Sequence, residues 1–109
     1  MHQSILILKV NLNSGQVEKA IDTEQETSHM VVYAPLSEKA FVANIRSGSV
    51  SVIDLKNDVL EKIIKTGEGA EGNALSADGK TVWITNRSAN TVTVIDVFTL
   101  ETVLSLHFL

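Results

Sequence analysis

Short runs in which apolar and polar residues alternate, each bounded by turn residues, follow one another along the chain. Alternation with a period of two is typical of strands that bury one face, as in the stretch SVSVIDL at residues 49–55. No stretch has the longer period that a helix of three turns requires. The pattern predicts an all-β chain with ten strands, at residues 4–12, 16–21, 30–34, 40–43, 49–55, 59–65, 73–76, 81–85, 91–97 and 102–107.

One stretch of fifteen residues occurs twice, 42 residues apart. Residues 41–55 read FVANIRSGSVSVIDL, and residues 83–97 read WITNRSANTVTVIDV. Ten of the fifteen positions match in kind, and the identical pairs are Asn44/Asn86, Val50/Val92, Val52/Val94, Ile53/Ile95 and Asp54/Asp96. A fixed period between about 20 and 50 residues indicates a repeat architecture.

Part of a third copy precedes these two. Residues 9–21, KVNLNSGQVEKAI, align with residues 52–64, VIDLKNDVLEKII, at a spacing of 43. The change of spacing falls in the polar stretch at residues 22–28, which is predicted to be a loop, where insertions are tolerated.

A repeat of this length with four strands matches one blade of a β-propeller, which must pack face to face on its neighbours. We expect a half blade at residues 1–28, a full blade at residues 29–70 and a second full blade at residues 71–109. Together these are about two and a half four-stranded antiparallel blades in an open arc. Because closed propellers have about four to eight blades, we expect a piece of a longer protein.

The composition excludes several classes of function. Hydrophobic residues make up 44% of the chain and charged residues 20%, which is typical of an ordered globular domain. The net charge of -4 is spread without a basic cluster, so no nucleic-acid partner is predicted. The sequence has no Cys, hence no disulfide and no thiolate site. No run is long enough for a membrane span, and residues 5–8 are too short for a signal peptide.

The motifs WITN at residues 83–86 and FVAN at residues 41–44 resemble those of the YVTN-type β-propeller family. The resemblance covers nearly the whole chain. Residues 74–97, ALSADGKTVWITNRSANTVTVIDV, follow the order of that family's blade at nearly every step: apolar strand, Asp-Gly turn, YVTN strand, polar turn and V-x-V-I-D strand. Residues 34–44 depart from it, because Ser37-Glu38-Lys39 replaces the Asp-Gly turn.

The resemblance implies an architecture more than an activity, because one fold carries many functions. Members described as surface-layer-like or lactonase-like imply a periplasmic or extracellular location. We expect a non-catalytic binding or scaffold propeller that contacts a protein or small-molecule ligand through its loops or channel mouth. One alternative is a lactonase-like or dehydrogenase-like enzyme with a polar channel site. Another is a module that associates with copies of itself through its open blade edges.

Two residues are candidates for ligand binding. His29 and Glu71 precede the predicted innermost strands of the two full blades, where side chains of a closed propeller border the central channel. Together they could bind a metal or polarise a carbonyl. The alternative is that both are solvated loop residues, since two positions alone make no catalytic constellation. We identify no catalytic residue, no metal-ligand set and no cofactor.

Other motifs favour structural interpretations. Residues 67–72 read GEGAEG, a literal G-x-G-x-x-G, but a strand rather than a helix is predicted to follow, so these glycines are assigned to a loop between blades. The repeated Asn44/Asn86 and Asp54/Asp96 are interpreted as turn-formers, because an active site needs a residue only once. Trp83 is predicted to pack between blades. Asn86-Arg87-Ser88 matches a glycosylation sequon by pattern only.

Overall fold

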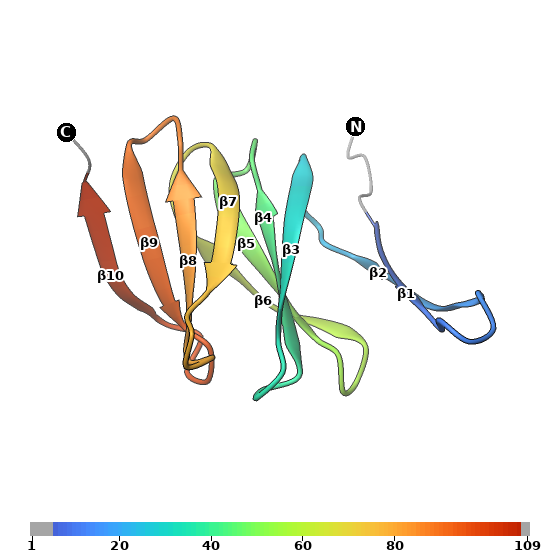
Figure 1. The fold of residues 1–109 in the computed structure, drawn as a ribbon. Helices are drawn as coiled ribbons and strands as arrows, with labels where there is room; N and C mark the ends of the chain where they lie inside the picture. Colours follow the sequence, from blue (N-terminus) through green and yellow to red (C-terminus); the bar gives the residue numbers. More distant parts are fainter. Residues whose placement is uncertain (1–5, 108–109) are drawn as a thin grey trace.

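Over the residues that the structure describes, the fold has ten antiparallel strands in three successive sheets (Figure 1). The computed structural model describes residues 6–107. A two-stranded N-terminal hairpin contains β1 (Leu6–Val10) and β2 (Val17–Asp22). The middle blade contains β3 (Ser28–Ala34), β4 (Lys39–Asn44), β5 (Ser49–Asp54) and β6 (Val59–Lys65). The C-terminal blade contains β7 (Ala70–Leu75), β8 (Thr81–Asn86), β9 (Thr91–Asp96) and β10 (Thr102–His107). The predicted all-β arc is confirmed.

The strand predicted at residues 73–76 in fact begins at Ala70. Ala70 pairs with Asn86 across β7 and β8, and a bulge separates this pair from the pair Gly72 and Thr85. The loop between the two blades is therefore shorter than expected, and Gly72 belongs to a strand. His29 and Glu71 likewise lie inside β3 and β7 rather than before them, which corrects their predicted positions.

The registers of the sheets show that the repeats are equivalent in three dimensions. Ile7 pairs with Ile21 in the hairpin, as Val50 pairs with Ile64 in the middle blade. We call the face of each blade that points toward the next blade in the chain its forward face, and the opposite one its rear face. Because side chains alternate along a strand, each residue's face follows from its register.

The main core lies between the forward face of the middle blade and the rear face of the C-terminal blade. It consists of aliphatic side chains around one buried ring, and its members include Phe41, Val50, Val52, Ile64, Val82, Ile84, Ile95 and Val97. A smaller core joins the hairpin to the rear face of the middle blade, with Ile7 and Ile21 against Val42 and Ile53. Lys9 adds an ion pair to Asp58, with 3.0 Å between Nζ and Oδ1.

Phe41 and Trp83 occupy equivalent positions but different environments. Phe41 is fully buried between the two blades, whereas Trp83 on the forward face of the C-terminal blade is 44% exposed. The Trp83 ring nitrogen donates a hydrogen bond to Thr81 Oγ1 on its own strand. The prediction that Trp83 packs between blades is wrong for the described chain, because its sheet is the last one along the arc.

Candidate functional site at the upper edge of the blades

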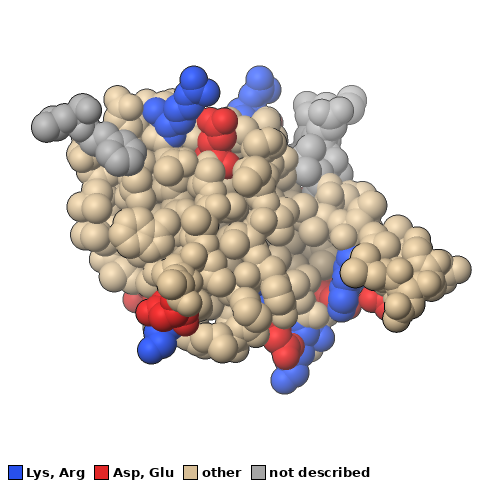
Figure 2. All heavy atoms as spheres, in the orientation of Figure 1, with Lys and Arg blue, Asp and Glu red and all other residues tan. Residues whose placement is uncertain are grey.

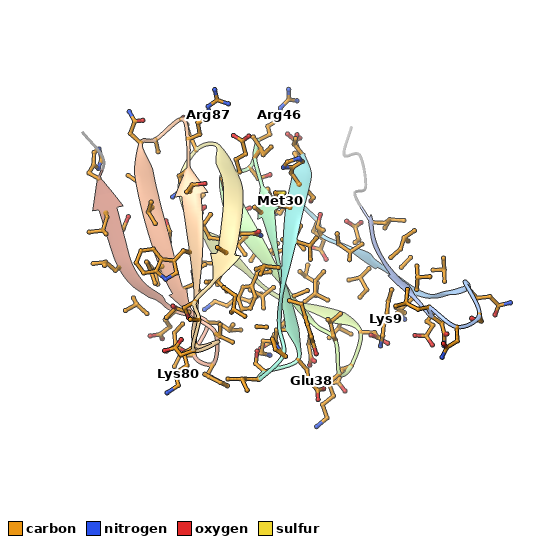
Figure 3. The ribbon with its side chains drawn as sticks, viewed as in Figure 1. Lys9, Met30, Glu38, Arg46, Lys80 and Arg87 are labelled. Carbon is orange, nitrogen blue, oxygen red and sulfur yellow. The ribbon has the colours of Figure 1, made fainter. Side chains whose placement is uncertain are left out.

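One edge of the arc, uppermost in Figures 1 and 3, contains the linkers between the sheets and one turn from each full blade. We call it the upper edge. It comprises the linkers at residues 23–27 and 66–69 and the turns at residues 45–48 and 87–90. Arg46 and Arg87 project from it, whereas Glu38 and Lys80 lie at the opposite, lower edge (Figure 3). Ligand contacts are therefore expected at the upper edge, where loops and charged side chains lie together.

Backbone hydrogen bonds hold these loops in a repeated arrangement. Ile45 N–H donates to the Thr27 carbonyl, and Arg87 N–H donates to the Gly69 carbonyl at the equivalent place. The Gly48 carbonyl also accepts from the N–H groups of Thr66 and Gly67, which ties the turn of the middle blade to the following linker. The loops that could hold a ligand are thus fixed by main-chain contacts rather than by side chains alone.

Below the loops, a buried polar network braces the middle blade. The Asn44 side chain is fully buried, and its Nδ2 donates to the hydroxyls of Ser49 and Ser51. Its Oδ1 accepts from Ser28 Oγ at 2.7 Å, and Ser28 Oγ lies 2.8 Å from Thr23 Oγ1. Asn44 is therefore structural, as predicted, although its partners are hydroxyl groups across the sheet rather than the backbone of a turn.

The C-terminal blade repeats only part of this network. Asn86 Nδ2 donates to Thr91 and Thr93, but Ala70 stands where the middle blade has Ser28, opposite the asparagine. Among the described residues, Thr66 Oγ1 and Asn86 Oδ1 are buried without a hydrogen-bond partner. Thr66 Oγ1 and Asn86 Oδ1 are the counterparts of Thr23 Oγ1 and Asn44 Oδ1, which Ser28 joins in the middle blade. Asn86 is also fully buried, so the sequon at this position is closed to modification.

The glycines of the G-x-G-x-x-G stretch are explained by close packing. A Cβ at Gly67 would lie 3.1 Å from the Asn86 side chain, and one at Gly72 would lie 2.6 Å from Thr85 Oγ1. Gly69 has a φ of +78°, and a Cβ there would lie 2.6 Å from the backbone nitrogen of Ser88. A strand follows the stretch instead of the helix that a dinucleotide site requires.

Three hollows lie along the upper edge. One of about 310 Å³ is lined by Glu71, Thr85, Asn86, Arg87 and Asn90. A second of about 400 Å³ is lined by Thr27, Ile45, Arg46, Glu68, Gly69 and Ser88. A third of about 240 Å³ is lined by Arg46, Ser47, Gly48, Lys65, Thr66, Gly67 and Glu68. All three are shallow and mix charged side chains with backbone groups of the turns.

The two predicted binding residues differ in their surroundings. Glu71 is half-buried and borders the first hollow, and its Oε2 lies 3.7 Å from Arg87 Nη1. His29 is exposed and lines none of these three hollows. Within residues 6–107 no hydrogen bond or ion pair joins His29 to Glu71, and no group of three potential metal-ligating side chains is present. The predicted binding role of both residues stays a prediction.

Sequence reasoning missed Arg46, Arg87 and Asn90 as contributors to the upper edge. The sequence does distinguish the two arginines, because they stand at turn positions that differ between the two repeats. Arg46 corresponds to Ser88, and Arg87 corresponds to Ile45. Positions that vary within a repeated scaffold are where binding residues are expected, because loops carry function on a rigid frame.

At the lower edge, by contrast, the two repeated aspartates accept hydrogen bonds within turns. Asp54 Oδ1 accepts from the N–H of Lys56, and Asp96 Oδ1 accepts from the N–H groups of Phe98 and Thr99. The side-chain amide of Asn57, followed by backbone donors, lowers the pKa of Asp54. The N–H groups of Thr99 and then Phe98 lower the pKa of Asp96. Both aspartates are thus confirmed as turn-formers.

No family model matches the chain. Two curated relatives, each described as uncharacterized protein YncE, come from Salmonella typhi and Salmonella typhimurium and are 33% and 32% identical over 85 residues. The aligned region covers 78% of this chain and 24% of each relative, so the chain spans about a quarter of their length. No helix among the described residues could cross a membrane.

Solved structures show the same fold over part of their chains. Hydrazine synthase of Kuenenia stuttgartiensis matches with a TM-score of 0.80 and 26% identity, over 96% of this chain and 30% of that one. The dihydro-heme d1 dehydrogenase NirN, in complex with DHE, matches with a TM-score of 0.81 and 19% identity, over 93% of this chain and 22% of that one. The chain therefore has the fold of part of a β-propeller and is similar in sequence to part of YncE.

Proposed function

We propose that the chain is the binding segment of a non-catalytic, YVTN-type β-propeller of the periplasm or cell exterior, and that its upper edge contacts a protein or small-molecule ligand. The observation that carries this proposal is the position of the three hollows on one edge of a rigid, repeated scaffold. Loops on a fixed frame are the usual carriers of binding. The fold matches and the YncE similarity support a propeller but assign no ligand.

Two guanidinium groups at this edge favour an acidic group on the ligand, and each hollow also has a glutamate, Glu68 or Glu71, on its lining. Arg46 borders two hollows, and among the described residues no ion pair engages its guanidinium. Arg87 borders the first hollow, and its side chain is 83% exposed beside Glu71. Guanidinium groups bind carboxylates through paired hydrogen bonds. A carboxylate-bearing small molecule or acidic peptide segment is therefore the class of ligand that the edge favours.

The test is an NMR titration of the chain with citrate and with a short polyglutamate peptide. We expect the backbone signals of Arg46, Arg87 and Gly69 to shift, and the shifts to weaken in the double variant Arg46→Ala, Arg87→Ala. Lys80→Ala at the lower edge is the matched control, since it removes an equal kind of charge from the opposite edge (Figure 3). Shifts centred on the lower edge, or none at saturating probe, would overturn the proposal.

The enzyme alternative has one observation in its favour, since two of the similar structures are named as a synthase and a dehydrogenase. In such an enzyme His29 or Glu71 would contribute to a polar channel site. Visible absorption and elemental analysis of the purified chain would distinguish the two proposals. Stoichiometric metal or haem that is lost on Glu71→Gln, but not on Lys80→Ala, would favour the enzyme over the binding segment.

A further inference from the structure

One hydroxyl group of the middle blade is replaced by a methyl group in the C-terminal blade. In the middle blade, Ser28 Oγ lies 2.8 Å from Thr23 Oγ1 and donates to Asn44 Oδ1 at 2.7 Å. A single oxygen atom therefore joins the linker at residues 23–27 to the sheet. Ala70 occupies the equivalent position of the C-terminal blade, and its side chain has no polar atom.

The two atoms that such an oxygen would join are present in the C-terminal blade. Thr66 Oγ1 and Asn86 Oδ1 are both buried, and no hydrogen bond within residues 6–107 engages either atom. The Asn86 side chain is fully buried, and a Cβ at Gly67 would lie 3.1 Å from its amide carbon. Buried polar atoms nearly always have a partner in folded proteins, because leaving one unpaired costs free energy. The site therefore requires a group that these residues do not themselves provide.

The linker of the C-terminal blade makes a longer contact with its sheet than the linker of the middle blade does. The two asparagine amides are held alike, because each donates to two hydroxyls of the neighbouring strand. In the middle blade, the Ser51 hydroxyl donates to the Thr23 carbonyl at 2.9 Å. At the equivalent place, the Thr93 hydroxyl donates to the Thr66 carbonyl at 3.5 Å. A molecule in non-bonded contact with the Ala70 methyl group needs such extra room, because it cannot approach as closely as a covalently bonded hydroxyl.

We propose that one resident water molecule is bound between Thr66 Oγ1 and Asn86 Oδ1, in contact with the methyl group of Ala70. The water donates to the Asn86 amide oxygen, as the serine hydroxyl does to its asparagine in the middle blade. Its other hydrogen bond is to the Thr66 hydroxyl, which can donate or accept. The inference depends neither on the proposed ligand nor on the ends of the arc, because Ala70 belongs to the core between the two full blades.

The chemistry of the site favours water over a metal ion or a charged ligand. Both partner atoms are neutral, whereas a divalent cation takes about six oxygen ligands that include carboxylates. The charged side chains of the upper edge lie along its rim, where they face solvent (Figure 2). Because a neutral hydroxyl fills the equivalent position of the middle blade, a neutral molecule with one heavy atom is the ligand that fits. Two hydrogen-bond partners are enough to hold a buried water.

The water fixes a linker that borders two of the hollows. Thr66, Gly67 and Glu68 line the hollow of about 240 Å³, and Glu68 and Gly69 line the hollow of about 400 Å³. The wall that these hollows share is therefore held by a molecule that exchanges with bulk solvent. The linker at residues 23–27 is held by a side chain instead.

Oxygen-17 relaxation dispersion of the solvent counts the long-lived internal water molecules of a protein and tests the site directly. Ala70→Ser places a hydroxyl at the site and should reduce the count by one. Ala74→Ser is the matched control, because Ala74 is exposed on the same strand, and it should leave the count unchanged. Equal counts in the unsubstituted chain and in Ala70→Ser would overturn the proposal.

A second variant and a crystal structure keep the test decisive if Ala70→Ser does not fold. Thr66→Val keeps the shape of the side chain but removes one of the two partners, so it should also reduce the count by one. Circular dichroism establishes that each variant is folded. Crystals of the unsubstituted chain should show the water about 2.7–3.1 Å from both oxygens. If Thr66 Oγ1 instead donates directly to Asn86 Oδ1, or if the count persists in Thr66→Val, the proposal is wrong.

Discussion

The middle blade and the C-terminal blade share a sequence repeat and a sheet register, yet they differ in what surrounds them. Each β4 residue has its counterpart in β8, and each β5 residue has its counterpart in β9. The middle blade has sheets on both faces, and the apolar residues at its centre are fully buried, namely Phe41, Val42, Ala43, Val50, Val52 and Ile53. The C-terminal blade is covered on its rear face only, which leaves Trp83 half exposed.

The two blades share the features that arise within one repeat, and they differ in the features that depend on other parts of the chain. Strand pairing and the Asp54 and Asp96 turns are the same in both blades, because their partners lie within one repeat. Burial of the aromatic ring depends on the next sheet along the arc, and completion of the asparagine network depends on Ser28 in β3, where β7 has Ala70. Substitutions at equivalent positions should therefore have unequal effects.

The largest difference is expected at the aromatic pair. Phe41→Ala should lower the free energy of unfolding by about 3 to 5 kcal/mol, because it empties a fully buried position in the main core. Trp83→Ala should lower it by roughly 1 kcal/mol at concentrations where the chain is monomeric, because nearly half of the indole already contacts water. Urea unfolding followed by circular dichroism measures both. Equal losses would mean that the forward face of the C-terminal blade is covered within one chain.

Two smaller effects on the free energy of unfolding, of opposite sign to each other, are expected at Ser28 and Ala70. Ser28→Ala removes the hydroxyl between Thr23 Oγ1 and Asn44 Oδ1 and should cost about 1 to 3 kcal/mol, because a buried acceptor loses its donor. Ala70→Ser should stabilise the chain by about 1 kcal/mol, because the new hydroxyl can join Thr66 Oγ1 and Asn86 Oδ1.

The double variant Asn86→Ala, Ala70→Ser is the control for that second effect. The gain from serine should disappear when its acceptor is absent, as urea unfolding of the two single variants and the double variant can show. A gain that persists without Asn86 would assign the stabilisation to helpful packing rather than to the hydrogen bond. In that case the missing hydrogen bonds of Thr66 Oγ1 and Asn86 Oδ1 would not explain the unequal effects of substitutions in the two blades.

The smallest effect concerns the two turn aspartates and depends on pH. Hydrogen bonds in the folded chain lower the pKa of Asp54 and Asp96, so both carboxylates stabilise the fold fully above their unfolded pKa of about 4. This stabilisation is lost as the pH falls from about 4 through the folded pKa values. Asn57→Ala should raise the pKa of Asp54 and leave that of Asp96 unchanged, because Thr99 stands at the position of Asn57.

NMR titration of the side-chain carboxyl signals measures both aspartates in one sample. Asp54→Asn and Asp96→Asn keep an acceptor oxygen but cannot titrate, so each should reduce the loss of stability between about pH 6 and pH 3. If Asn57→Ala shifts both pKa values, the change acts through the whole fold and not through the Asn57 amide.

Much of the fold could be predicted from the sequence because its causes are local. Period-two alternation assigns the strands, and the 42-residue repeat assigns them to blades. The wrong secondary-structure prediction concerns residues at which local signals conflict. Gly72 and its neighbours read as a loop, yet Gly72 lies in β7 because its missing side chain leaves room for Thr85. At the upper edge, Glu71 is the one of the two predicted binding residues that borders a hollow, and the sequence pattern did not indicate Arg46 or Arg87.

The sequence by itself determined the strands, the repeat and the aspartate turns, since each rests on residues a few positions apart. Only the tertiary structure decided that Phe41 is buried and Trp83 half exposed, that Ser28 completes a network which Ala70 interrupts, and that three hollows share one edge. The physical reason is that the burial of a face depends on which sheet covers it, and that a hydrogen-bond network depends on which side chains the folded sheet brings together. Two repeats with the same pattern can therefore have different neighbours.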